Sequence, residues 1–204
     1  MRRILLFFLF LFFLHSASSQ NKTIGLVLKS NLAHLQLRET VVPLPGFEIG
    51  GSVKYPWKSK IDLVTGVSFR FFQYQVQFRP NDINRHRDYN EQLFHLNIPL
   101  EFSYKITPHR WRAKWGVWGS YLLAAKIGLA NGLTYIENHR VLYSDLYFGT
   151  NVGFSHIFKS GIEATIDYSF AINNIYGGEG NKPFGSSRKG LDLVSFGIIV
   201  PIKL

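Results

Sequence analysis

The chain has no cysteine among its 204 residues, and its 13 acidic residues are outnumbered by 23 lysines and arginines. Without cysteine, the sequence excludes disulfide bonds, thiolate metal sites and the acylated cysteine of a lipoprotein anchor. Long apolar runs are also scarce. Only Ile4 to Leu14 forms one, and its eleven residues fall short of the roughly 20 that a transmembrane helix needs. The sequence therefore predicts no membrane-spanning helix.

The N-terminus has the pattern of a secretory signal peptide. Arg2 and Arg3 precede the apolar run, and the small residues Ser16 to Ser19 follow it, so we expect cleavage after Ser19. Loss of the two arginines lowers the formal charge from +10 to +8. In an exported chain, anionic lipid headgroups or polysaccharides are the expected counter-charges, and nucleic acid is not an expected partner.

Side chains alternate strictly between apolar and polar along His95 to Ile106. One face carries Leu96, Ile98, Leu100, Phe102, Tyr104 and Ile106, and the other carries His95, Asn97, Glu101, Ser103 and Lys105 together with Pro99. A period of two predicts a β-strand. These twelve residues exceed the usual globular strand of about five or six and match the roughly 9–11 of a membrane-spanning strand.

Similar alternation occurs in the segments 23–30, 46–57, 61–78, 111–128, 145–158, 162–174 and 191–204. Short and long connections alternate between these segments, which indicates an up-and-down meander with all short turns at one end. We therefore predict an all-β fold for residues 20–204, an eight-stranded antiparallel up-and-down transmembrane β-barrel with short periplasmic turns and longer external loops. At Phe71-Phe72 two apolar residues follow each other, and the alternation shifts by one residue. We expect a β-bulge there, with Phe72 and Tyr74 on the apolar face and Gln73 on the polar face.

The distribution of charge separates this barrel from a soluble lipocalin-like barrel of equal strand number. The polar faces of the predicted strands carry six basic and five acidic residues: Lys29, Glu48, Lys54, Asp62, Arg70, Glu101, Lys105, Lys114, Lys126, Glu163 and Asp167. On the other face, His156 is the one ionisable side chain between the turns, and the bulky residues there would overfill a barrel of this size. We therefore expect lipid outside, a buried network of opposed charges inside, no cofactor and little or no conductance.

Aromatic residues are expected to form a girdle at each membrane interface. Trp57, Trp111 and Phe158 flank the short turns, and Tyr135, Tyr143, Tyr147 and Tyr176 lie near the long loops.

Three strands resemble the PorT-like outer-membrane β-barrel family of Gram-negative bacteria. The similar segments are Leu96-Asn97-Ile98-Pro99-Leu100, the glycine-aromatic stretch from Gly116 to Lys126, and Tyr168 to Ile175, while the first strand matches only loosely because Ser30 replaces a usual glycine. The resemblance implies an eight-stranded barrel in the cell outer membrane, and for some members a part in protein secretion. Leu204 departs from the terminal aromatic residue common in such barrels.

No catalytic or metal-binding arrangement stands out in the sequence. Ser155 and His156 alternate between faces, and His86 and His95 lack metal-ligand spacing. Basic residues cluster in two external loops, with Arg79, Arg85 and Arg87 in one and Lys182, Arg188 and Lys189 in the other. These loops are either ordinary solvated loops or contacts for anionic lipopolysaccharide.

The sequence thus favours a monomeric, non-enzymatic outer-membrane barrel with a structural or accessory role, in protein secretion or surface interaction. The alternative is a transporter or channel for small solutes through a partly open lumen. A lipid-modifying enzyme would need a paired nucleophile and base, and the sequence shows no such pair.

Overall fold

The computed structural model describes residues 22–35, 40–77, 89–106, 110–129, 135–137, 143–173 and 191–202. These residues form nine β-strands: β1 (Thr23–Leu35), β2 (Thr40–Lys58), β3 (Ile61–Gln77), β4 (Tyr89–Lys105), β5 (Trp111–Leu129), β6 (Tyr135–Glu137), β7 (Leu146–Ile157), β8 (Glu163–Ala171) and β9 (Leu191–Ile202). No helix in the described part of the chain is long and apolar enough to cross a membrane.

The strands close into a ring. Each strand pairs antiparallel with its neighbour, β1 pairs with β9, and β4 pairs with β5. The ring contains β1, β2, β3, β4, β5, β7, β8 and β9, whereas the three-residue β6 attaches only to β5. This closed antiparallel barrel confirms the predicted fold. The sequence did not predict β6.

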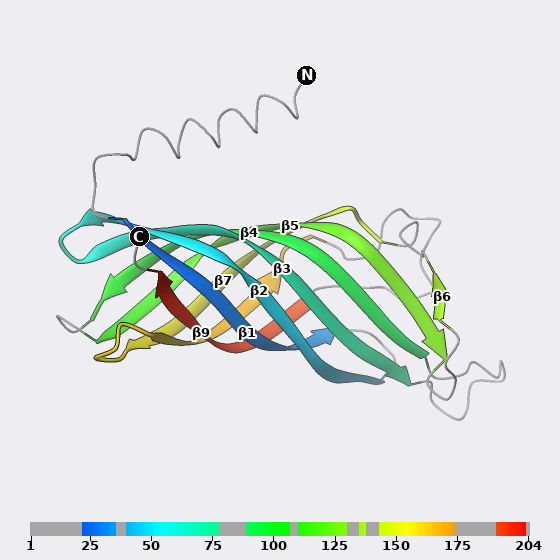
Figure 1. Ribbon diagram of the computed structural model, residues 1–204. Coiled ribbons are helices and arrows are strands. Elements are labelled where there is room, and N and C mark those ends of the chain that lie inside the picture. Colours follow the sequence, from blue (N-terminus) through cyan, green and yellow to red (C-terminus); the bar gives the residue numbers. More distant parts are fainter. Residues whose placement is uncertain are drawn as a thin grey trace, which may run out of the picture.

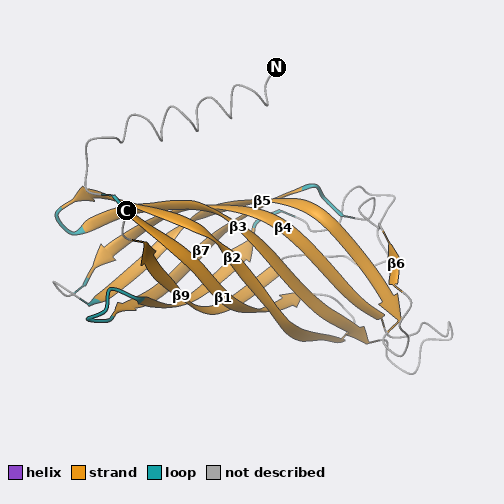
Figure 2. Cartoon of the chain, in the orientation of Figure 1, coloured by secondary structure: helices purple, strands orange, loops and turns teal. Residues whose placement is uncertain are grey.

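The barrel has two unlike ends (Figure 1). The β2–β3, β4–β5 and β7–β8 connections lie together at one end, with the start of β1 and the end of β9, which we call the short-turn end. The strands run obliquely to the barrel axis, as Figure 2 shows. In outer-membrane barrels the short turns are periplasmic and the long loops face outward.

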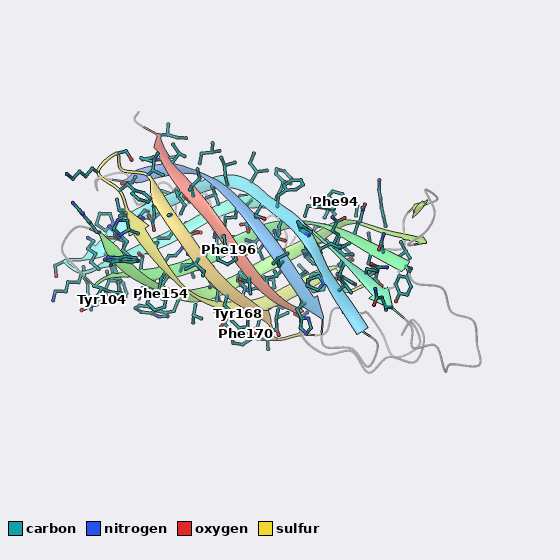
Figure 3. The ribbon with its side chains drawn as sticks, turned by 90° about the horizontal axis from the view of Figure 1, so that it is seen from below. Phe94, Tyr104, Phe154, Tyr168, Phe170 and Phe196 are labelled. Carbon is teal, nitrogen blue, oxygen red and sulfur yellow. The ribbon has the colours of Figure 1, made fainter. Side chains whose placement is uncertain are left out.

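Large apolar side chains cover the outside of the barrel. Phe154, Tyr168 and Phe196 project from its outer side (Figure 3), and 56% of Phe154 and 50% of Phe196 is exposed. The residues next to them along each strand are buried in the lumen, as the burial of Asp167 and Ser195 shows. A strand whose exposed face is apolar and whose buried face is polar is suited to lipid outside and a polar interior.

Strand β3 does not slip at Phe71-Phe72 as predicted. Its alternation is unbroken, so Phe72 and Tyr74 are buried in the lumen and Gln73 faces outward. The irregularity lies instead in β2, where Leu44 opposes Gln73 but Phe47 opposes Phe71, leaving one extra residue in β2. The prediction was wrong because the shift in the apolar pattern of β3 marks a change in which face of the strand is apolar, and the strand itself has no extra residue.

Candidate functional site

Ion pairs fill the half of the lumen nearer the short-turn end. The pairs are Lys29–Asp167 (2.8 Å), Lys54–Glu163 (2.5 Å), Arg70–Glu48 (2.9 Å), Lys105–Asp62 (3.0 Å), Lys114–Asp167 (2.9 Å) and Arg112–Asp62. All five carboxylates on the predicted polar face, including Glu101, are at most 7% exposed. Buried charges of this kind are tolerated only when they are paired and hydrogen-bonded.

Neutral side chains complete the hydrogen bonding of these carboxylates. The Ser68 hydroxyl donates to Glu48 Oε1 at 2.6 Å, and the Ser155 hydroxyl donates to Glu163 Oε1 at 2.6 Å. Glu101 accepts from the Asn151 amide nitrogen at 2.6 Å. The carboxylates are therefore bound from several strands, including strands that are not neighbours in the ring.

Four of these six ion pairs join strands that are not neighbours in the ring. Lys54 on β2 reaches Glu163 on β8, and Asp167 on β8 binds Lys29 on β1 and Lys114 on β5. These contacts skip one strand, β9 or β7, or two strands, β1 and β9, so they bridge parts of the wall that no strand pairing connects.

Two basic residues differ from the sequence prediction. Lys126 points away from the lumen, because Leu123 is an extra residue in β5 and places Lys126 opposite Gln92 on the outer face. Arg112 was absent from the predicted polar face of the strands, yet it points inward and binds Asp62. Arg112 lies next to the outward-pointing Trp111 and two positions before the inward-pointing Lys114. This period of two could have identified it as an inward-pointing residue.

On the side of the ion pairs away from the short-turn end, an apolar layer of side chains closes the lumen. Its members are no more than 1% exposed: Phe72, Leu93, Leu122, Tyr147, Leu191 and Leu193. His95 lies between the Phe72 ring at 4.9 Å and the Tyr147 ring at 4.8 Å. The Arg70 guanidinium lies 5.6 Å from the Trp118 ring centroid and joins the two layers. We call Phe72, Leu93, Leu122, Tyr147, Leu191 and Leu193, together with His95, the aromatic layer.

Glu91 is a further buried carboxylate that the sequence placed in a loop. It is 0% exposed and accepts hydrogen bonds from the hydroxyls of Tyr74 and Tyr143, the latter at 2.5 Å. Tyr143 and Tyr147 were expected in an interfacial girdle, but they are only 4% and 0% exposed. That expectation was wrong for both, because their rings fill the lumen.

One small cavity lies inside the described part of the lumen. A cavity of about 40 Å³ lies among the charged residues, with Lys29, Glu48, Arg70, Glu101 and Lys114 in its lining. This volume suits a few water molecules and excludes a larger solute.

The described residues do not form a recognisable catalytic arrangement. Ser155 faces Glu163 inside the lumen, whereas His156 is on the outer face, 4.6 Å from the Trp111 ring and 5.0 Å from the Phe158 ring. The described residues also contain no group of three His, Cys, Asp or Glu that could hold a metal.

The predicted external residues Arg79, Arg85, Arg87, Lys182, Arg188 and Lys189 lie outside the described residues, as do the predicted signal peptide, residues 1–19, and Tyr176 of the predicted girdle. Trp57, Trp111 and Phe158 are between 50% and 58% exposed at the short-turn end, as expected of the other girdle.

Comparison with known proteins identifies a solved structure, Neisserial surface protein A, that shares this fold. Neisserial surface protein A has a TM-score of 0.57 at 12% identity, with 90% of this chain and 100% of that chain covered. OprG of Pseudomonas aeruginosa has a TM-score of 0.48 at 9% identity, with 91% and 97% covered. No curated protein matches the chain. The family model for the outer membrane protein beta-barrel domain matches residues 38–177. Since this match spans more than half of the sequence, the chain belongs to that family and is a protein of the outer membrane.

Proposed function

We propose that this protein is a non-conducting, non-enzymatic outer-membrane barrel that acts through its cell-surface end in a structural or accessory role. Residues 1–19 would direct its export. The filled lumen is the observation that carries the proposal, because an ion-pair network and an aromatic layer occupy it in succession. Arg79, Arg85 and Arg87 are proposed to contact anionic lipopolysaccharide at the surface.

The lumen favours this role over the transport of small solutes. A solute would have to displace Phe72, Leu122 and Tyr147 and also separate buried ion pairs such as Lys54–Glu163. Breaking a buried ion pair costs several kcal/mol, about 3–5 when one partner is removed. In the described part of the barrel, the side chains of both layers therefore stand in the way of a hydrated solute.

Planar-bilayer recording tests the closed lumen. The purified barrel should show no steady single-channel steps under conditions in which a large porin conducts. The matched control combines Phe72→Ala and Tyr147→Ala in the aromatic layer with Lys54→Ala and Glu163→Ala in the ion-pair network, because it opens both filled layers and should give measurable openings. Steady steps from the unchanged protein would favour the transport alternative.

The accessory role extends to support of protein secretion, which the PorT-like resemblance suggests. Deletion of the gene, followed by comparison of the secreted and surface proteins, tests this part of the proposal. We expect a defined set of proteins to be lost from the surface or medium and restored by the unchanged gene. An unaltered set would exclude the secretion role and leave a structural or adhesive role.

A further inference from the structure

The short-turn end of the barrel carries a ring of basic side chains. Lys58 and Lys60 lie at the β2–β3 connection, Arg110 precedes β5, and Lys159 lies between β7 and β8, all four of them exposed. Lys22 lies next to the start of β1. We call these five residues the basic rim, which lies on the left in Figure 1.

The basic rim is not neutralised by acidic neighbours among the described residues. Asp62 and Glu163 are the carboxylates that follow the β2–β3 and β7–β8 turns most closely along the chain. Both point into the lumen and are only 3% and 4% exposed. Asp62 binds Lys105 and Arg112, and Glu163 binds Lys54. The rim charges therefore remain available to a ligand outside the barrel.

Aromatic side chains place the rim at the depth of lipid headgroups. The Lys58 ammonium lies 5.2 Å from the Trp57 ring centroid, and the Lys22 ammonium lies 5.7 Å from the Tyr55 ring centroid. Trp111 and Phe158 directly adjoin Arg110 and Lys159 in sequence, and each is 50% exposed on the outer face. Tryptophan beside lysine or arginine marks the level where acyl chains give way to headgroups.

The apolar outer face ends differently on the side away from the short-turn end. Gln73 and Gln92 form an outward amide pair at 3.3 Å just beyond the contacting rings of Phe71 and Phe94, which are tilted by 38°. Lys126 lies opposite Gln92 on the outer face. On these strands the aromatic boundary is thus followed mainly by uncharged amides, whereas at the short-turn end it is followed by cations.

We infer that the basic rim binds the phosphate groups of anionic phospholipids in the periplasmic leaflet. The cations directly follow the apolar side chains of the outer face, so lipids in contact with Trp57 and Trp111 would present their headgroups to the rim. A basic side chain near an anionic bilayer surface strengthens association about fivefold. The barrel would gather a shell of anionic lipid around its short-turn end, which would fix its depth in the membrane.

Tryptophan quenching by brominated lipid tests this inference. Trp57, Trp111 and Trp115 are between 43% and 58% exposed near the rim, whereas Trp118 is buried in the lumen. The mature barrel is placed in phosphatidylcholine vesicles with a minor fraction of phosphatidylglycerol, and bromine is carried on the acyl chains of either lipid at equal amount. Brominated phosphatidylglycerol should quench severalfold more efficiently, and added salt should reduce the difference.

The matched variants separate charge from shape. Lys58→Gln, Lys60→Gln and Lys159→Gln together should strongly reduce the preference, because only Arg110 and Lys22 of the rim remain, and the same three positions changed to arginine should keep it. Equal quenching by the two brominated lipids in the unchanged protein would overturn the inference, as would an undiminished preference in the glutamine variant. If equal quenching is accompanied by co-sedimentation with purified cell-wall polymer, the rim instead serves an acidic wall ligand and the lipid inference fails.

Discussion

Replacement of Asp167 by asparagine is expected to lower the free energy of unfolding by about 3–5 kcal/mol. The two carboxylate oxygens of Asp167 lie 2.8 Å from Lys29 Nζ and 2.9 Å from Lys114 Nζ, and the side chain is 3% exposed. Asparagine keeps the shape but removes the charge, so two lysines would remain inside the barrel without their counter-ion. Gly153 on β7 pairs with Asp167, and a side chain at this glycine would collide with the carboxylate.

Urea unfolding in phosphocholine vesicles, followed by tryptophan fluorescence, measures this loss. Asp145→Asn is the control, because Asp145 is exposed at the other end of the barrel and should change stability by less than about 0.5 kcal/mol. A variant in which Lys29, Lys114 and Asp167 are all replaced by apolar residues should lose less than Asp167→Asn, since no charge is left unpaired. If Asp167→Asn unfolds like its control, the ion pairs contribute little to the stability of the barrel.

The sequence was informative about which side of a strand a residue occupies. Glu48, Asp62, Glu163 and Asp167 were placed inward by their alternation with large apolar residues, and the structure places all four inside. The period of two is a local property of the backbone, so it can be read from a single segment wherever one face meets lipid.

Partners across the lumen could not be predicted in the same way. The contact of Lys54 with Glu163 joins residues 109 positions apart, and it depends on barrel closure and strand register. Register itself changes where β5 contains the extra Leu123, which turns Lys126 outward. Local sequence carries no signal for such a shift when small and apolar residues such as Ala124 and Ala125 follow the bulge.

The aromatic layer was misjudged for a different physical reason. Gln73 and Gln92 lie on the outer face beyond the rings of Phe71 and Phe94, and we infer that these rings mark the edge of the hydrocarbon. Beyond this boundary the outer face can be polar, and the lumen can be apolar. The rule that apolar means outward therefore reverses along one strand, as the burial of Phe72 shows.

The same boundary predicts opposite results for one substitution made at two depths of β4. Ile98 is 43% exposed and lies midway between Phe94 and Phe102, which contact aromatic residues of other strands at the two interfaces. Ile98→Arg should therefore lower the free energy of unfolding in a bilayer by about 2–4 kcal/mol, because it places a charge near the middle of the hydrocarbon.

Gln92→Arg is the matched control, since it introduces the same side chain on the same face of the same strand, two positions beyond Phe94. There the expected cost is about 0–1 kcal/mol for the guanidinium itself, because it reaches water or headgroups, and repulsion from Lys126 on the opposite strand adds at most about 1 kcal/mol. Urea titration in vesicles measures both values, and the fraction of heat-modifiable barrel on gels checks that each variant has inserted. Equal losses at the two positions would mean that Phe94 does not mark the edge of the hydrocarbon, and the membrane position deduced from the aromatic rows would then be wrong.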